Sequence, residues 1–406
     1  KLLNQEFFTS MVKIITTFFS ILSVLKRRLR GASFLQSFHI IFSHTLKIVI
    51  TLFQALRYTI QNSSQPSQLE ENTINGNRDW IQSLDEDVAS CQNELIVMSY
   101  NVLAPVHTTP RILRFPNCPA TAMEWDYRER RIIADVVALS ADVVCFQEVQ
   151  AGRVYTSLCN NLEKQGYIPI SIGLTLRQKG RQEGCAIFYA AHKLNECHSD
   201  SIEIGKALQK QLNISENVAN SVGLNHGTVA QLALFESKQS GQMFWINNIH
   251  VVNLWQRPDI QTCEIATMLH HSHQTITDVR EGVAHIVCGD FNAQPNTLGY
   301  RLMNGSLNVD EQVRKSTLSS VIGQLGKHWC APQKFISTYS ALRAGEELPF
   351  TNLTIEFQGT LDYIWLADDD RLAIKAVLNV PREQEACPNW ANGSDHLPIC
   401  TKLVWM

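Results

Sequence analysis

Short apolar runs alternate with amphipathic segments over most of the chain, and this alternation limits the possible folds more than any other feature. Strand-like runs cover residues 95–100, 143–146, 186–189, 229–235, 244–249, 286–288, 363–366 and 396–403. Helical spacing of apolar residues marks 125–139, 153–165 and 259–279. Strands interleaved with helices predict a layered α/β domain. Strands between 186 and 249 lack a strong intervening helix, which predicts antiparallel pairs and a mixed sheet.

Polar side chains stand at the ends of six of these apolar runs. The residues are Asn101, Glu148, His250, the pair Asp290 and Asn292, Asp362, and the pair Asp395 and His396. Each alone has a plainer interpretation, because a carboxylate after an apolar run often marks a strand's exit to solvent and Asp-Phe-Asn can form a turn. Functional groups nevertheless collect where strands end, since the sheet fixes the backbone while the loops leave room for a ligand. Six such endings in one domain predict a functional site.

These side chains suit the hydrolysis of a phosphodiester. A hard divalent cation needs carboxylate and amide oxygens, and the sequence offers Glu148, Asp290, Asn101 and Asn292. Mg²⁺ prefers few protein ligands and several waters, so a small set suffices. Asp290 can orient or deprotonate the attacking water.

Two histidines complete this inventory. His250 and His396 are candidates for contacting the charge that develops on the phosphate. Asp395 could fix the tautomer of its neighbour His396 or of another ring. The plainer interpretation of a single histidine is a core or surface residue, so this assignment depends on the other strand-end groups.

Charge and cysteine content exclude several classes of protein. Residues 1–69 carry eight Lys or Arg and one acid, which leaves 27 basic and 37 acidic residues in the remainder. A region this acidic would bind nucleic acid only through a local basic patch or bridging cations. This argues against a protein that coats nucleic acid without sequence preference. The eleven cysteines form no C-x-x-C, and several lie in apolar runs. We therefore expect reduced, buried thiols and no zinc site.

The chain divides into three parts. Residues 1–60 form an apolar, basic extension whose uncharged segments fall short of the ~20 apolar residues of a secure membrane span. This extension fits organelle targeting, contact with a membrane surface, or a poorly ordered segment without function. Residues 61–90 read as a polar linker, and residues 91–406 as the catalytic domain. Residues 305–333 are expected to form a long loop with one short helix.

Several separated motifs carry a family resemblance. In chain order they are MSYNVLAP, CFQEVQ, EGCAIFY, IVCGDFNAQP, GTLDYIW and GSDHLPI. Together they resemble the exonuclease–endonuclease–phosphatase superfamily, whose fold is also that of deoxyribonuclease I. Residues 121–150 and 349–365 are similar to its carbon-catabolite-repression deadenylase branch, with nocturnin, the angel proteins and 2′-phosphodiesterase as relatives. The resemblance covers residues 94–406 and implies a four-layer αββα sandwich with two mixed β-sheets and a Mg²⁺-dependent, 3′-end-directed nuclease.

The resemblance also assigns roles to single residues. It implies that Glu148 is the main metal ligand with Asn101 beside it, and that Asp362 is the carboxylate of a second metal, so that one or two Mg²⁺ ions bind and Mn²⁺ can substitute. Its implied catalytic residues are Asp290, Asn292, His250, His396 and Asp395, with Asp290 activating water. Its implied substrate-binding residues are Phe357, which would stack on a terminal adenine, together with Pro258 and Asn352.

The sequence departs from the family at three points. Asn248 stands where the family usually has Thr before the catalytic His, and the Pro that normally follows that His is displaced to Pro258. No leucine-rich-repeat module, by which deadenylases of this branch join their large complex, is found upstream.

A basic loop contains Arg177, Lys179 and Arg181. It fits a solvated loop, or one that touches RNA phosphates.

Three functions remain open from the sequence. The first is a Mg²⁺-dependent 3′-to-5′ exoribonuclease that removes poly(A) tails from mRNA, acting in the cytoplasm or nucleus on RNA with a 3′ adenosine tail. The second is a 2′-phosphodiesterase, or a nocturnin-like or angel-like phosphatase acting on a dinucleotide or a cyclic-phosphate RNA end. The third is a catalytically inactive, membrane-tethered binding protein, which the intact set of acids, amides and histidines disfavours. The extension leaves mitochondrial or membrane-associated localisation as alternatives.

Overall fold

The computed structural model describes residues 78–110, 114–178, 180, 182–221, 223–307, 333–382 and 385–406. The predicted extension 1–60, most of the predicted linker 61–90 and most of the loop expected over 305–333 lie outside these residues. The described strands are β1 (Trp80–Gln82), β2 (Glu94–Asn101), β3 (Val143–Gln150), β4 (Tyr167–Pro169), β5 (Thr175–Leu176), β6 (Glu183–Ala190), β7 (Leu194–Glu203), β8 (Val229–Ser237), β9 (Met243–His250), β10 (Ala284–Asp290), β11 (Phe335–Ser337), β12 (Asn352–Leu353), β13 (Gln358–Gly359), β14 (Asp362–Ala367), β15 (Leu372–Leu378) and β16 (Ile399–Trp405).

Helices connect and cover these strands. They are α3 (Glu86–Ser90), the 3₁₀ helix η1 (Pro105–His107), α5 (Ala120–Met123), α6 (Trp125–Leu139), α7 (Arg153–Glu163), α8 (Ile204–Leu212), α9 (Glu216–Ser221), α10 (Pro258–Val279), α11 (Leu298–Met303) and α14 (Thr338–Leu342). Every strand and helix predicted from apolar spacing is present, although β16 begins three residues after the predicted start at 396. Among the described helices, none is long and apolar enough to cross a bilayer.

The strands form two large mixed sheets, as predicted. The order of the first is β1-β15-β16-β2-β3-β6-β4, with β5 also paired to β6, and the order of the second is β11-β14-β10-β9-β8-β7. Each contains one parallel pair, β2 with β3 and β9 with β10, beside antiparallel neighbours. The region 186–249 is less simple than expected, because β6 belongs to the first sheet and helices α8 and α9 separate β7 from β8.

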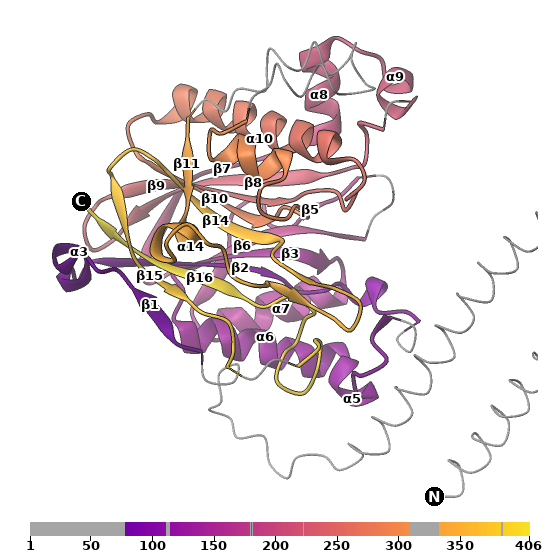
Figure 1. Ribbon diagram of the computed structural model, residues 1–406, viewed down its shortest axis with the longest axis horizontal. Coiled ribbons are helices and arrows are strands. Elements are labelled where there is room, and N and C mark those ends of the chain that lie inside the picture. The colour runs from indigo at the N-terminus through magenta and orange to yellow at the C-terminus, as the bar shows by residue number, and fades with distance from the viewer. Residues whose placement is uncertain are drawn as a thin grey trace, which may run out of the picture. The chain divides into compact units, whose positions relative to one another are not determined.

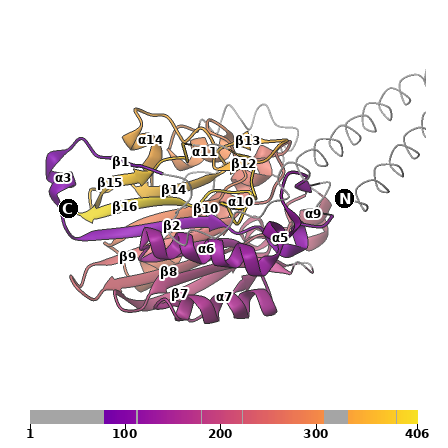
Figure 2. The same ribbon diagram turned by 90° about the horizontal axis from the view of Figure 1, so that it is seen from below.

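Side-chain alternation places three apolar layers on these sheets. Along β2, Leu95 and Val97 face the second sheet, whereas Met98 and Tyr100 pack with apolar residues of α6 and α7. The outer face of the second sheet packs with α8, α10 and α11. Figure 1 shows α10 along one side and α6 and α7 along the other, with both sheets between them, and Figure 2 shows α6 and α7 covering the first sheet. The domain is therefore the expected αββα sandwich.

The folded domain begins before residue 91. Strand β1 pairs antiparallel with β15, and the ammonium of Lys402 lies over the Trp80 ring, 4.7 Å from its centroid. The Arg78 guanidinium donates to the Pro398 carbonyl at 2.8 Å. The linker boundary drawn at residue 90 was thus too late, since a strand of three residues is too short to show a period in the sequence.

The cysteines agree with the reduced state expected from composition. Within the described ranges no cysteine is in a disulfide bond, and Cys145, Cys185 and Cys288 are buried in the sandwich. Trp245 and Trp365 are fully buried, whereas Trp125 is only partly buried on α6.

Candidate active site

Three neighbouring strands of the second sheet bring functional side chains side by side. Asp290, the last residue of β10, is the register partner of His250 on parallel β9 and of Asp362 on antiparallel β14. Gly289 makes this close pairing feasible, because a Cβ atom there would lie 1.9 Å from the backbone oxygen of Ile249, and its φ is 146°. The glycine before Asp290 in the sequence is therefore a requirement of strand packing.

The carboxylate of Asp290 receives donors from both sheets. Its Oδ2 lies 3.0 Å from Nδ2 of Asn101, 3.5 Å from Nε2 of His250 and 3.7 Å from Nε2 of His396. Burial, followed by the negative charge of Asp362, raises the pKa of Asp290 to about 7, while His396 and Asn101 oppose the shift. A carboxyl with a pKa near neutral is suited to accept a proton from water.

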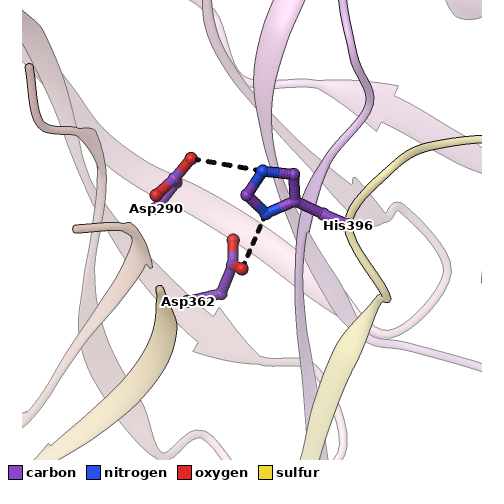
Figure 3. A group of neighbouring side chains, drawn as sticks. All are labelled: Asp290, Asp362 and His396. Carbon is purple, nitrogen blue, oxygen red and sulfur yellow. Dashed lines mark hydrogen bonds and ion pairs between the residues drawn. The ribbon is translucent and has the colours of Figure 1, made fainter. Parts of the chain in front are cut away.

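Asp362 fixes the orientation of His396 (Figure 3). Its Oδ2 lies 2.8 Å from Nδ1 of His396 and also accepts a hydrogen bond from the Thr351 hydroxyl at 2.5 Å. Burial alone would lower the pKa of His396, but the charges of Asp362 and Asp290 raise it well above its ordinary value. His396 is thus held as a donor that faces Asp290 through Nε2.

The tautomer role considered for Asp395 belongs instead to Asp362. The Asp395 carboxylate accepts a hydrogen bond from the Ser394 hydroxyl at 3.3 Å, whereas Nδ1 of its neighbour His396 faces Asp362. The two neighbours thus direct their side chains to different partners, so adjacency in the sequence does not produce a contact here. Asp395 still acts on the site electrostatically, because its charge contributes to raising the pKa of Glu148.

Glu148 reaches the site from the first sheet through a distortion of β3. The β3–β6 register shifts between Phe146 and Val149, and Glu148 has a φ of 58°. Its Oε2 accepts from the Ala104 amide at 3.0 Å, and its Oε1 accepts from Asn101 Nδ2 at 3.2 Å. Burial, more than any neighbouring charge, raises the pKa of the Glu148 carboxyl.

Asn101 links the two carboxylates. Its Nδ2 donates to both Glu148 and Asp290, and its Oδ1 accepts from the Leu103 amide at 3.0 Å. In this arrangement Asn101 holds Glu148 and Asp290 together and does not direct its oxygen at them. Its role as a metal ligand stays a prediction.

Several residues at or next to the site have strained backbone conformations. Leu103, Glu148 and Asn292 all have positive φ values, between 48° and 58°, which residues other than glycine rarely adopt. Asn292 is held by several hydrogen bonds: its backbone amide donates to Asp290 Oδ1 at 2.9 Å, and its Nδ2 donates to the Val251 carbonyl at 2.9 Å. Strained conformations persist where surrounding structure enforces them, which is common at active sites.

The donor set fits a divalent cation. Among the described residues, Asp290, Asp362 and His396 bring potential ligand atoms within 4.8 Å of one another, and because His396 is held as a donor, the two carboxylates are the ligands that this group offers. Asp362 Oδ1 is buried and has no hydrogen-bond partner, which leaves one carboxylate oxygen available to a ligand. The raised pKa values of Asp290 and Glu148 show that their negative charges are not fully compensated by nearby positive groups. A bound cation would supply that compensation, and Mg²⁺ favours carboxylate oxygens as ligands. These residues are therefore compatible with a metal site, and Glu148 is linked to it because Asn101 donates hydrogen bonds to both Glu148 and Asp290.

The predicted substrate-binding residues are placed differently from one another. Phe357 lies in the turn between β12 and β13 and is 36% exposed. A methyl group on Gly359 would lie 2.7 Å from the Phe357 ring and 3.0 Å from Gln294 Nε2, so the ring lies close to the loop that follows Asp290. Asn352 is bridged through its backbone to His396. These contacts place the Phe357 turn next to the candidate site.

Pro258 has a structural position of its own. It is the first residue of α10, where its fixed φ favours helix initiation and its missing amide costs no hydrogen bond. Its carbonyl accepts from the Thr262 hydroxyl at 2.7 Å. The described contacts give no direct support for Pro258 as a wall of a base-binding site, and that role stays a prediction.

Two residues of the site were not assigned by the sequence. Thr351 binds the Asp362 carboxylate, and its hydroxyl also accepts from the Leu361 amide at 2.9 Å. Arg177, expected in a solvated or RNA-contacting loop, is buried at 7% exposure, and its Nη1 lies 3.4 Å from Nδ1 of His250. The loop's Gln, Lys and Arg content predicted solvent exposure, so no sequence signal marked Arg177 as an interior residue. Lys179 and Arg181 lie outside the described residues.

The chain belongs to the Endonuclease/Exonuclease/phosphatase family, whose sequence model matches residues 98–396. It is 26% identical to the CCR4-Not complex 3'-5'-exoribonuclease subunit Ccr4 of Kluyveromyces lactis, over 84% of this chain and 44% of that protein. It is 27% identical to 2',5'-phosphodiesterase 12 of Homo sapiens, over 76% of this chain and 51% of that protein. The chain thus spans about half the length of these curated relatives.

Solved structures confirm the fold. The crystal structure of ANGEL2, a 2',3'-cyclic phosphatase, matches with a TM-score of 0.65 and 21% identity, over 82% of this chain and 98% of that one. The family and branch predicted from the motifs, and the sandwich they imply, are therefore confirmed.

Proposed function

We propose that this chain is a Mg²⁺-dependent phosphodiester hydrolase, and specifically a 3′-to-5′ exoribonuclease that removes poly(A) tails from mRNA. The observation that carries the hydrolase proposal is the Asp290 carboxylate, which has a pKa near neutrality and lies between two histidines beside Asp362 and the Asn101–Glu148 pair. The names of the Ccr4 relatives support RNA cleavage from the 3′ end.

Each side chain has a definite role in this reaction. Asp290 orients the attacking water and accepts its proton, for which its raised pKa is suited. His250 and His396 direct Nε2 toward the same side of Asp290, where they can donate to phosphoryl oxygens as negative charge develops. Glu148 and Asp362 would hold Mg²⁺, one ion or two, with Asn101 and Asn292 beside it. When bound, the ion supplies Lewis-acid polarisation of the phosphoryl group.

Recognition of a terminal adenosine depends on Phe357. Base stacking on an exposed aromatic ring is a common way to bind single-stranded RNA. The Phe357 ring is partly exposed on a turn whose strand β12 is bridged to His396, so a stacked base would lie close to the catalytic residues. Asn352 and Pro258 are further candidates for contacts with that nucleotide.

A second candidate function uses the same catalytic residues. The similarity to 2',5'-phosphodiesterase 12 favours a 2′-phosphodiesterase. The other form of this candidate is a nocturnin-like or angel-like phosphatase acting on a dinucleotide or a cyclic-phosphate RNA end. The surrounding loops would select between these substrates, because the hydrolytic residues serve all of them. A catalytically inactive binding protein is disfavoured, since the carboxylates and imidazoles remain assembled in hydrogen-bonding geometry.

The location of the protein follows from the same proposal. An enzyme acting on mRNA tails belongs in the cytoplasm or nucleus. The apolar, basic residues 1–60 would add mitochondrial targeting or membrane contact, and fractionation of cells expressing the chain with and without these residues distinguishes the three cases.

One experiment separates the two candidate functions. The purified full chain is given 3′-oligo(A) RNA, oligo(U), 2′-5′-linked oligoadenylate, RNA with a cyclic-phosphate end, and NADPH, each with Mg²⁺ and again with EDTA. We expect oligo(A) to be shortened fastest and EDTA to stop the reaction, with Mn²⁺ able to restore it. Faster cleavage of any other substrate would replace the deadenylase proposal, and unchanged activity in EDTA would contradict the metal requirement.

A further inference from the structure

A buried arginine stands behind one of the two histidines. Arg177 is 7% exposed, and its Nη1 lies 3.4 Å from Nδ1 of His250, on the side of the ring away from Asp290. A guanidinium has donors and no acceptor, and it stays protonated in proteins. Nδ1 of His250 must therefore accept this hydrogen bond. The single ring proton of a neutral His250 then lies on Nε2, which faces Asp290 Oδ2 at 3.5 Å.

Other buried groups hold the guanidinium in this place. Its Nη2 donates to the Thr228 hydroxyl at 3.4 Å, and that hydroxyl donates to Glu264 at 2.8 Å. Its Nε lies 3.8 Å from Glu183 Oε1, which forms a buried ion pair. Burying a charge is costly unless it is paired, so this many partners indicates that the Arg177 position is structurally enforced.

The two histidines consequently have opposite groups behind them. His396 has a carboxylate on Nδ1, since Asp362 Oδ2 lies 2.8 Å away and can only accept from it when ionised. His250 has a guanidinium on Nδ1, which can only donate. The same ring nitrogen is thus a donor in one histidine and an acceptor in the other. The imidazoles are not interchangeable, although both present Nε2 to Asp290.

We infer that Arg177 is a positioning residue that fixes His250 in its Nε2–H tautomer, so that this ring donates a hydrogen bond to the phosphoryl group. Arg177 acts through the ring and does not touch the phosphate, because His250 lies between the guanidinium and Asp290. The use of this donor in catalysis rests on the proposed phosphodiester hydrolysis. The tautomer itself does not, and it can be measured without any reaction.

Histidine NMR tests the tautomer directly. The full chain is labelled with ¹³C and ¹⁵N in histidine, and the His250 signals are assigned by their loss in His250→Gln. We expect unprotonated ¹⁵Nδ1 and protonated ¹⁵Nε2 in the unmodified protein. A protonated Nδ1 would overturn the inference, and this result needs no variant of Arg177 to fold.

Substitution of Arg177 tests whether the guanidinium is the cause. Arg177→Met keeps the apolar length of the side chain and removes the donor that holds His250 Nδ1 as an acceptor. We expect the His250 signals to shift toward a protonated Nδ1, and Arg177→Lys to restore the original pattern in part. Arg153→Met, which removes an exposed arginine paired with Asp126, is the matched control and should leave the His250 signals unchanged. Unshifted signals in a folded Arg177→Met protein would refute the assignment.

Steady-state kinetics test the positioning role independently on the same variants. We expect Arg177→Met to lower kcat on the cleaved substrate by about ten- to hundredfold, as for other residues that orient a catalytic group, with KM changed by less than about twofold. A loss confined to KM would contradict a positioning role. If the chain cleaves none of the substrates, the proposed function fails in this arm while the NMR arm still decides the tautomer.

Discussion

Single side chains determine what this site can do to its substrate. The carboxylate of Asp290 is buried beside Asp362 and has donors on several sides. Its raised pKa allows it to take a proton near neutral pH, while the imidazoles remain available as donors. The protonation of Asp290 thus depends on neighbouring side chains a few ångströms away. Substituting one of these side chains is therefore expected to change the rate of the reaction.

Phe357 is expected to contribute to binding more than to chemistry. Stacking on an aromatic ring is worth about 1–3 kcal/mol per base, so Phe357→Ala should raise KM for oligo(A) RNA about tenfold or more while changing kcat much less. Steady-state kinetics on oligo(A) measure this, with Val137→Ala as a control because Val137 is similarly exposed on the outer helix α6. A KM equal to that of the unmodified chain would rule out the stacking role.

Glu264 makes the stability of the domain depend on pH. Burial raises its pKa from 4.5 to about 7, although the Val252 amide and the Thr228 hydroxyl both bind the carboxylate. The folded state therefore holds the proton more tightly than the unfolded state, so the free energy of unfolding falls as pH rises from about 4.5 to 7. The shift corresponds to about 3 kcal/mol at most.

Glu264→Gln should remove this contribution. The amide oxygen of the glutamine can accept from the Val252 amide, and its nitrogen can donate to the Thr228 hydroxyl in place of the hydrogen bond that this hydroxyl donates to Glu264. The fold is therefore expected to persist while the pH dependence of urea unfolding between pH 5 and 7 becomes flatter. Glu163→Gln, at the exposed end of α7, is the matched control. Identical slopes for Glu264→Gln and the unmodified chain would show that Glu264 does not titrate in this range.

Which residues come together at the site was predictable to the extent that strand ends converge. Asn101, Glu148, His250, Asp290, Asp362 and His396 were named from the sequence, and the structure brings them together. The pairing of Asp362 with His396 was missed, because contact partners across strands depend on register. Arg177 was missed for a related reason: a basic loop segment gives no sign that one of its residues turns inward.

Secondary-structure elements set the spacing of the site, and the β9–β10 pair is the most constrained of them. Parallel strands here bring Asp290 and His250 into register, and Gly289 permits the contact with the Ile249 carbonyl. Strand β14 then adds Asp362 by antiparallel pairing. Any change that separates β9 from β10 should therefore disturb catalysis and folding together.

Gly289→Ala tests this constraint. Its Cβ would lie 1.9 Å from the Ile249 oxygen, so the variant is expected to unfold at much lower temperature or to accumulate as insoluble protein. Gly282→Ala is the matched control, because Gly282 has a φ of 76° with open space around its Cβ position. In Gly282→Ala the free energy of unfolding should fall only by about 1 kcal/mol, which is the cost of a non-glycine residue in this backbone conformation. Equal thermal stability of the two variants would contradict the close-packing argument.

Elements with strong apolar periodicity were predictable, and weakly patterned ones were not. The predicted helix 125–139 coincides with α6, whereas β7, with the sequence LNECHSDSIE, has too few apolar residues to be recognised as a strand. It is stabilised by pairing with β8. Helix α8 does carry apolar residues at helical spacing, Ile204, Leu208 and Leu212, although no helix was predicted there.

At the scale of the whole molecule, the site exists because the two sheets end at the same place. A buried polar link joins them beneath it: Gln147 Nε2 on β3 donates to Ser99 Oγ at 3.1 Å and to Asn248 Oδ1 at 2.8 Å. Asn248, which departs from the family's usual Thr, also donates to the Phe146 carbonyl at 2.9 Å. The layered class was predictable from periodicity, but the four-layer arrangement required the family resemblance, because apolar runs do not reveal which strands share a sheet.

The central claim is that Asp290 activates water for phosphodiester hydrolysis in a metal-dependent site, and Asp290→Asn tests it most directly. The amide has nearly the same shape but cannot accept the proton, so Mg²⁺-dependent cleavage of oligo(A) RNA by the full chain should fall by at least about 100-fold while circular dichroism stays unchanged. Asp278→Asn, on the exposed surface of α10, should retain full activity. Activity of Asp290→Asn within twofold of the unmodified chain would contradict the account.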